Sequence, residues 1–460
     1  MKKNNVVYGI GNLGYSVISQ TVCNFFVFFG TSVLKLSGVL VGTAVAISTI
    51  WDGLTDPIVG YISDRYRIGK LGYRKGYMLI ATIGMMLCNL QVWFVPVGTN
   101  NVVKFIWIIL SLILLETFNT MYSTPYSALG SDLADEYHDR TKIQISKTIF
   151  FIIGMIVPSV LIAVCLPNTT EYPIGQLNPN GYKVIAIISS FICLVSGVLC
   201  IVFTKENNGI KPYVSDNKLS IKQMLVDFVS TLKNKSLRVI ILGDSISMIA
   251  GIILTSVGMH FFTYCFYYTS TQITIILFTL LVATCVSQPL WFTISKKRDK
   301  KFALLIAILV SVVGAFSVMI VYVFRFKISA VSFYFAIISM FICGFGSGAL
   351  YSLPSSIYSD EVSAINEREG LSKTATYTGM LTFAGNIASA VTLLIVGGLL
   401  DIIGFDGEAL DQSLSVQTGL ALMLFVGVMV VLLISYYMFS LYNPTKLNND
   451  SKKVEKFVQE

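Results

Sequence analysis

Two aspartates, Asp52 and Asp56, stand four residues apart in an otherwise apolar stretch of the chain. On a helix this spacing places both carboxylates on one face, about one turn apart. A charged side chain inside a membrane is costly unless it meets water, a cation or a partner. Each carboxylate has two oxygens, which suit a hard cation such as sodium. The two negative charges also repel each other, and binding a proton relieves that repulsion. The pair therefore predicts a site for a cation or a proton.

The composition shows that the helix carrying this pair crosses a membrane. Of 460 residues, 33 are Lys or Arg and 25 are Asp or Glu, so 13% are charged, about half of the ~25% usual in soluble proteins. The hydrophobic content is 54% and the mean hydropathy is +0.73. A soluble surface needs more charge than this, which excludes a soluble enzyme.

Twelve stretches are long and apolar enough to span a bilayer, which takes about 20 residues. They are 7–34, 38–62, 77–97, 104–131, 144–167, 182–204, 239–268, 272–294, 302–324, 329–357, 371–400 and 416–442. With both termini in the cytoplasm, 28 of the 33 Lys and Arg residues fall on the cytoplasmic side. The remaining five are Lys35, Lys104, Lys183, Arg325 and Lys327. This bias predicts a multi-pass protein of the cell (plasma) membrane with both termini cytoplasmic.

The expected fold is an all-α membrane protein with twelve transmembrane helices in two six-helix halves. The halves cover residues 1–204 and 239–442, separated by a cytoplasmic loop, 205–238, and followed by a tail, 443–460. Equal halves of this kind are typical of duplicated transporters. A capping-box pattern at Ser220, followed by apolar residues at helical spacing, predicts an amphipathic helix in the loop.

The stretch Ile50-Trp-Asp-Gly-Leu-Thr-Asp-Pro-Ile-Val-Gly-Tyr-Ile62 resembles the second helix of the glycoside-pentoside-hexuronide cation symporters, the melibiose permease family of the major facilitator superfamily. Thr124-Pro-Tyr-Ser127, His260-Phe-Phe-Thr-Tyr264 and Arg368-Glu-Gly370 support this resemblance, which covers nearly the whole chain. It implies the major facilitator superfamily fold and cation-coupled transport.

The resemblance also implies which residues bind the coupling ion. In the family, the matching two Asp residues bind the cation together with an amide of the intervening turn and a threonine of helix four. The matching residues here are Asp52, Asp56, Thr55 and Thr120. Thr55 stands where the melibiose permease has Asn, so sodium and proton both stay open.

Three other polar residues lie inside predicted spans. Glu116 precedes Thr120 by one turn and so faces the same cavity, either as part of the ion site or as a protonated packing residue. Asp244 is expected to have a structural role, reaching the interface or Arg238. A lone histidine on an apolar helix, His260, is expected to be a packing residue.

The sugar-binding side departs from the family pattern. Ser16 and Ser123 match the two family aspartates that bind sugar hydroxyls, and Thr382 lies near the place of the helix-eleven lysine. The polar residues expected to line a substitute site are Ser16, Gln20, Asn24, Asn119, Tyr122, Ser123, Tyr126 and Asn386. An anionic solute needs a positive partner at the midplane, and residues 374–400 contain no Lys or Arg. We therefore expect a neutral or zwitterionic solute with Tyr126 beneath it.

The predicted function is symport: a sodium ion or a proton drives the import of a small organic solute by alternating access. The solute expected first is a glycoside or related sugar. Asp64, Arg65 and Arg368 would help to close the cytoplasmic face. The alternatives are a symporter of a lysolipid or other amphiphile and a non-transporting membrane sensor. No catalytic motif indicates an enzyme or a cofactor. The expected partners are the solute, the coupling cation and the lipid bilayer; we expect a monomer and no nucleic acid.

Overall fold

The computed structural model describes residues 3–68, 72, 74–96, 98–133, 137–204, 231–329, 331–369 and 374–443. Within these ranges the protein is almost entirely helical, and twelve helical spans are long and apolar enough to cross a membrane. The prediction of an all-α protein with twelve spans is confirmed.

The first six spans form one group of helices. They are α1 (Lys3–Phe28) with its π-helical continuation η1 (Phe29–Val33), α2 (Gly38–Arg65), α3 (Lys75–Trp93), α4 (Asn101–Asp132), α5 (Tyr137–Cys165) and α6 (Pro179–Phe203). A short 3-10 turn, η2 (Gly175–Leu177), precedes α6.

The last six spans form a second group. They are α8 (Lys235–Phe266), α9 (Ser270–Lys297), α10 (Lys300–Phe324), α11 (Ser332–Leu350) with α12 (Leu353–Glu369), and α13 (Thr374–Ile402). The final span consists of α14 (Leu414–Ala421), the π-helical η3 (Leu422–Val426) and α15 (Gly427–Ser440).

Polar caps fix where several spans begin. The Ser37 hydroxyl accepts a hydrogen bond from the Leu40 N–H at the start of α2. At the start of α9, Thr269 and Gln272 form a capping box. Such caps satisfy N–H groups that have no partner within the helix.

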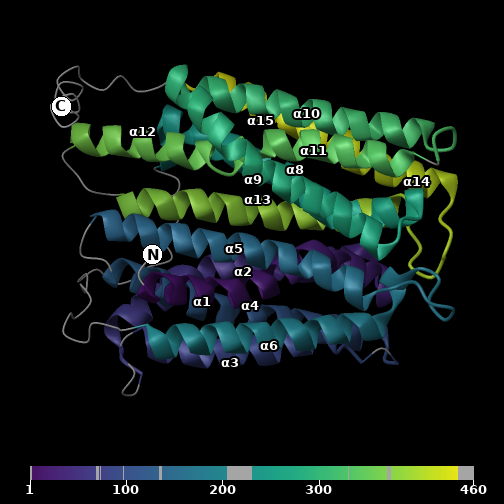
Figure 1. The fold of residues 1–460 in the computed structure, drawn as a ribbon, viewed down its shortest axis with the longest axis horizontal. Coiled ribbons are helices and arrows are strands. Elements are labelled where there is room, and N and C mark those ends of the chain that lie inside the picture. Colours follow the sequence, from purple (N-terminus) through teal and green to yellow (C-terminus); the bar gives the residue numbers. More distant parts are fainter. Residues whose placement is uncertain are drawn as a thin grey trace.

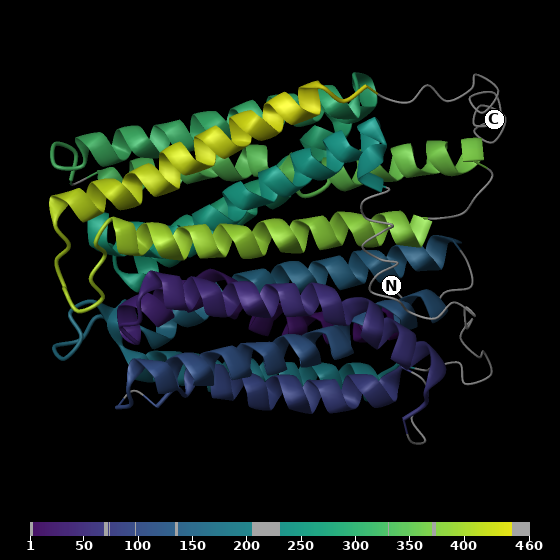
Figure 2. The same ribbon diagram turned by 180° about the vertical axis from the view of Figure 1, so that it is seen from behind.

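The two helix groups lie side by side, and the start of α1 and the end of α15 lie at the same end of the bundle (Figure 1). We call this the terminal end and the opposite one the distal end. Contacts between the groups run mainly through three helix pairs, α2 with α13, α5 with α9, and α1 with α8. The view from behind shows α13 lying directly along α2 (Figure 2).

The tenth span consists of two helices with a break between them. The sequence analysis predicted one continuous stretch, 329–357, without a break. The break falls at Tyr351 and Ser352, between α11 and α12. Pro354 follows it, and a proline, which lacks an N–H group, is well tolerated in the first turn of a new helix. Gln288 satisfies polar groups at the break, because its Nε2 donates to the Gly348 carbonyl at 2.8 Å and its Oε1 accepts from the Ser352 hydroxyl at 3.1 Å.

Two expectations fall outside the described residues. The amphipathic helix predicted around Ser220 lies there, as does nearly all of the tail. The side chains of Asp64, Arg65 and Arg368 are also outside, although their backbones belong to α2 and α12. The cytoplasmic gate therefore stays a prediction.

The two groups are joined tightly at the distal end. Six hydrogen bonds between described residues cross from one group to the other, and all of them lie in the distal half of the bundle. They join Thr31 to His260, Gly38 and Val39 to Asp401, Gln176 to Tyr268, Ser270 to Leu166, and Thr274 to Ser159. No hydrogen bond between described residues joins the groups at the terminal end. We call the residues of these six bonds the distal seam.

Glycines allow the backbones of α2 and α13 to touch within this seam. A Cβ atom on Gly397 would collide with the carbonyl oxygen of Gly38, and one on Gly42 would lie 2.5 Å from the carbonyl oxygen of Leu393. Both oxygens of Asp401 also accept hydrogen bonds from the first N–H groups of α2, at 2.5 Å from Gly38 and 3.0 Å from Val39. A carboxylate there complements the positive end of the helix dipole.

Candidate functional site

A carboxylate pair on α2 and a hydroxyl on α4 form the centre of the site. The Thr120 hydroxyl donates a hydrogen bond of 2.8 Å to Oδ1 of Asp52 and also lies beside the Asp56 carboxyl group. Thr55 is buried on the same helix, and its hydroxyl donates to the Asp52 carbonyl at 3.1 Å. The structure thus brings together the four residues expected to bind a cation.

Two neighbouring contacts position the carboxylates. The indole N–H of Trp51 donates to the Thr117 hydroxyl at 2.8 Å, which ties α2 to α4 next to the pair. On the other side, Gly53 lets α13 approach, because its missing Cβ would lie 3.1 Å from Nδ2 of Asn386. Asn386 therefore lies beside the carboxylate pair.

Glu116 and Asn119 extend this polar region along α4. The amide of Asn119 donates to Oε2 of Glu116 at 3.0 Å. The Glu116 carboxyl group is close enough to Asp52 and Asp56 to interact with their charges. Asn119 is 3% exposed, and its amide oxygen has no hydrogen-bond partner. An oxygen buried without a partner is a suitable additional ligand for a cation.

These groups do not form a dense metal centre. Within the described ranges, no three His, Cys, Asp or Glu side chains converge closely enough to hold a metal ion. The ligand set is instead two carboxylates with neutral hydroxyl and amide oxygens, a mixture of hard oxygen ligands.

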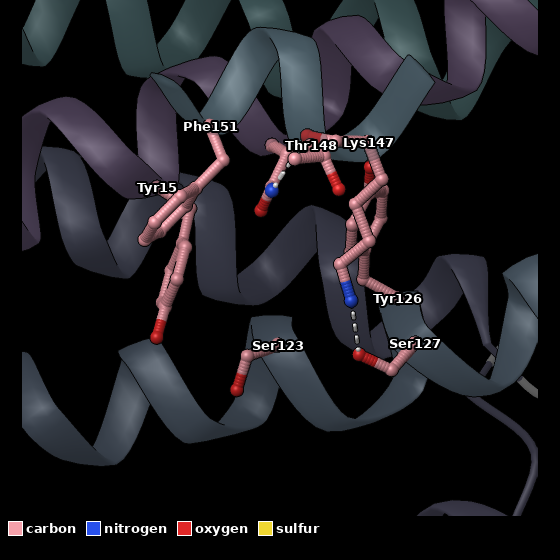
Figure 3. Close-up of a pocket in the computed structure, with 8 residues that line it drawn as sticks. Tyr15, Ser123, Tyr126, Ser127, Lys147, Thr148 and Phe151 are labelled. Carbon is pink, nitrogen blue, oxygen red and sulfur yellow. Dashed lines mark hydrogen bonds between the residues drawn. The ribbon is translucent and has the colours of Figure 1, made fainter. Parts of the chain in front are cut away.

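A pocket of about 370 Å³ lies between α1, α4 and α5, on the terminal side of the carboxylate pair. Aromatic, hydroxyl, amide and ammonium groups share its wall (Figure 3). The lining residues are Asn12, Tyr15, Ser123, Tyr126, Ser127, Lys147, Thr148 and Phe151. Ser123 is one turn from Thr120 on α4, so the ion site and the pocket share a helix.

Several predicted solute ligands instead use their polar groups to hold helices together. Ser16 donates to the Phe151 carbonyl at 2.9 Å, and Tyr122 donates to the Gly11 carbonyl at 2.8 Å. Tyr126 and Tyr8 each donate to the other's backbone carbonyl, with their rings stacked 4.4 Å apart.

The eight predicted solute-binding residues therefore divide by position. Only Ser123 and Tyr126 line the pocket, and Tyr126 presents its ring because its hydroxyl is already bonded. Gln20 and Asn24 lie on α1 and do not line this pocket. Asn119 donates to Glu116 and Asn386 lies against Gly53, while Ser16 and Tyr122 bond to backbone carbonyls.

Lys147 is a pocket residue that the sequence analysis missed, because it was counted with the cytoplasmic loop before the fifth span. Its Nζ donates to the Ser127 hydroxyl at 3.0 Å and lies 5.4 Å from the centre of the Tyr126 ring. Its spacing from Phe151, one helical turn, was the available signal. The expectation that no positive charge lies at the midplane considered only the helix that carries Thr382, whereas Lys147 lines a pocket on the terminal side of the carboxylate pair.

Two isolated polar residues have different surroundings. Asp244 is 6% exposed and forms no side-chain hydrogen bond or ion pair with a described residue, so the expected pairing with Arg238 is not seen. His260 is fully buried, with Nε2 2.7 Å from the Thr31 hydroxyl and Nδ1 3.1 Å from the Ser256 carbonyl. Both histidine nitrogens have partners, as in a packing residue.

Comparison with known proteins identifies the family. The model of the family described as MFS/sugar transport protein matches residues 7–446. The chain belongs to this family. It is 22% identical over 474 residues to sodium-dependent lysophosphatidylcholine symporter 1-A of Danio rerio, covering 95% of this chain and 85% of that one.

Bacterial relatives match over shorter stretches. The chain is 28% identical over 218 residues to an uncharacterized symporter of Synechocystis, covering 46% of this chain but only 38% of the relative. It is 22% identical over 222 residues to the inner membrane symporter YicJ of Escherichia coli, covering 48% of this chain and 47% of that one.

Solved structures show the same fold. The D-xylose-proton symporter has a TM-score of 0.65 at 14% identity, covering 96% of this chain and 98% of that one. A mutant of the nucleoside transporter NupG has a TM-score of 0.65 at 15% identity, covering 95% of this chain and 100% of that one. The multi-pass membrane architecture of the major facilitator superfamily, expected from the resemblance, is confirmed.

Proposed function

We propose that this protein is a symporter in which a cation, sodium or a proton, drives the import of a small organic solute. The observation that carries the proposal is the hydrogen bond from Thr120 to Asp52 across α4 and α2, with Asp56 one turn along α2. Carboxylates inside a membrane mark ion pathways. The relatives whose names describe sodium-dependent symporters support the same function.

The ion would be held by oxygens from two helices. Asp52 and Asp56 supply negative charge, and Thr55, Thr120 and the free amide oxygen of Asn119 supply neutral ligands. Bound sodium, or a proton on one carboxylate, reduces the buried charge of the pair. That reduction lowers the cost of enclosing the site, which couples ion occupancy to the movement of the two helix groups.

The charge bias supports cytoplasmic termini, so that the distal seam faces outward. The five basic residues expected on the outer side lie at distal helix ends or in distal loops. In this orientation the seam closes the outer side and the pocket belongs to the inward-facing state. Transport then requires the seam to open while the terminal ends of the groups approach each other.

The solute can be a glycoside or an amphiphile. Serine and threonine hydroxyls in the pocket suit sugar hydroxyls. The aromatic side chains of Tyr15, Tyr126 and Phe151 give the pocket a partly apolar wall that also suits an amphiphile. The lysophosphatidylcholine symporters among the relatives support this second candidate.

A stability assay on the purified protein tests ion binding without knowledge of the solute. The midpoint of thermal unfolding is measured in sodium chloride and in choline chloride at equal ionic strength, over a range of pH. A ligand at one hundred times its Kd stabilises the folded state by about 2.7 kcal/mol, so sodium should raise the midpoint by a few degrees. The rise should vanish in Asp52→Asn.

A matched control is another buried carboxylate, which lies on α8. Asp244→Asn removes such a group without touching the ion site and should keep the sodium response. Stabilisation by acid instead of sodium, lost in Asp52→Asn, would identify the proton as the coupling ion. The proposed ion site is excluded if neither sodium nor acid produces a response that depends on Asp52.

A further inference from the structure

Three other lysines of this bundle, each buried or half-buried, share a structural role. Their ammonium groups bind backbone carbonyls at the C-terminal ends of helices or just beyond them, where the helix dipole favours positive charge. These contacts join Lys75 to Thr204 after α6, Lys104 to Leu34 after η1, and Lys301 to Ser440 and Tyr442 at the end of α15.

Lys147 does not follow this rule. Its ammonium group donates to a neutral hydroxyl, that of Ser127, and lies over the ring of Tyr126. Among the described residues, neither a carboxylate nor a backbone carbonyl accepts a hydrogen bond from it. An ammonium group has three donors, so two of them remain for another partner.

The surroundings of Lys147 suit a ligand. Its side chain reaches from α5 across the pocket to Ser127 on α4, with the hydroxyl of Ser123 on the same wall (Figure 3). Lys147 lies in the first turn of the membrane span Ile145–Cys165, where contact with water is reduced. A cation in such a place is stabilised by a negative partner.

The other walls limit the shape of that partner. Tyr15 and Phe151 cover the side of the pocket away from Ser127 (Figure 3). Tyr126 also lines the pocket, but it is 1% exposed and its ring stacks on that of Tyr8, so it adds little open surface. A suitable ligand therefore combines a compact negative group with a less polar body.

We propose that Lys147 binds the anionic group of the transported solute, a carboxylate or a phosphate, with Ser127 beside it and the aromatic walls around the rest. This inference rests on the proposed transport function and defines its substrate class as organic anions and zwitterions. The inference also keeps the transported net charge small, because an anionic solute that moves together with a cation carries little net charge through the membrane.

Two pairs of probes test the inference on the purified full chain in sodium chloride. One pair is p-nitrophenyl glucoside and p-nitrophenyl glucuronide, and the other is monoacylglycerol and lysophosphatidic acid. Apparent affinities come from titrations followed by thermal unfolding. We expect at least one acidic probe to bind about tenfold or more tightly than its neutral partner, as for a charge-assisted hydrogen bond. The pair that responds distinguishes a carboxylate from a phosphate.

Substitutions then assign the preference to Lys147. Lys147→Gln should reduce the preference for the acidic probe to near one, and Lys147→Arg should keep most of it. Lys183→Gln removes a half-buried lysine outside the pocket that donates to Asn180 and lies over Phe94, and should leave the preference unchanged.

The inference is overturned if the wild type binds neither acidic probe, if both neutral probes bind as tightly as their acidic partners, or if Lys147→Gln keeps the preference. The sodium response in the same assay separates the two proposals. A sodium response without a preference for acidic probes refutes only the role of Lys147. If the wild type responds to neither sodium nor acid, the ion site on which the proposed function depends is refuted.

Discussion

Two side chains of the distal seam, Asp401 and His260, differ in their hydrogen bonding from two side chains around the pocket and the carboxylate pair, Lys147 and Asn119. In the seam, Asp401 has hydrogen-bond partners for both carboxylate oxygens, and His260 for both ring nitrogens. Around the pocket and the ion site, the ammonium group of Lys147 and the amide oxygen of Asn119 retain free hydrogen-bonding capacity. Filled capacity stabilises one arrangement of the helices, whereas free capacity can be filled by an ion or a solute. Under the proposed function, residues of the first kind hold a conformation and residues of the second kind bind the ion or the solute.

The largest expected effect comes from neutralising the ion site. Asp52→Asn and Asp56→Asn should each abolish uphill accumulation of solute in proteoliposomes, because the ion loses a charged ligand, while exchange of solute can survive. Asp244→Asn, a buried carboxylate outside the site, should keep concentrative uptake. Unchanged accumulation in both site variants would remove the distinction between the two regions.

A methyl group beside the distal seam should also reduce transport strongly, but for a steric reason. Gly397→Ala places a Cβ atom against the carbonyl oxygen of Gly38, so α2 and α13 cannot close in the observed way. Transport should fall by at least tenfold, while the sodium-dependent rise in unfolding temperature persists. The neighbouring Gly398→Ala is the control, because nothing lies within 4 Å of its added Cβ. Equal effects of the two alanines would show that the close contact is not needed.

A smaller effect is expected at the cap of α2. Asp401→Asn keeps the size of the side chain but removes the charge that binds two N–H groups, a loss of about 1 kcal/mol. That loss would shift the equilibrium toward an open seam by about fivefold. Spin labels at Lys35 and Glu408, whose side chains are 3.7 Å apart here, would report the shift as a larger population at long distances. An unchanged distance distribution would show that the cap does not bias the equilibrium.

The smallest and most informative change is Glu116→Gln. If Glu116 acts on the ion through its charge, the variant should transport solute with a shifted dependence on sodium or pH, since its carboxyl group interacts with those of Asp52 and Asp56. The bond from Asn119 can still form to the new amide oxygen. An unchanged dependence together with a lower unfolding temperature would instead indicate a packing role.

The carboxylate pair could be found in the sequence because its signal is local. Asp52 and Asp56 lie one helical turn apart, and their spacing alone placed them on one face. Thr120 was found only through the resemblance to a family, and the structure shows the hydrogen bond that joins it to Asp52. The roles of Ser16 and Tyr122 could not be found in this way, because each bonds to the backbone of a different helix.

The sequence by itself determined the membrane class, the twelve spans and the helix that carries the carboxylate pair. Those features depend on apolar length, on the distribution of Lys and Arg, and on spacing within one helix. Only the tertiary structure decided that Lys147 faces the pocket, that Tyr126 offers its ring, and that Asp401 caps another helix. The physical reason is that a side chain's partners depend on which helices pack together. In a membrane that choice is made by close packing and long-range hydrogen bonds, and hydropathy does not record either of them.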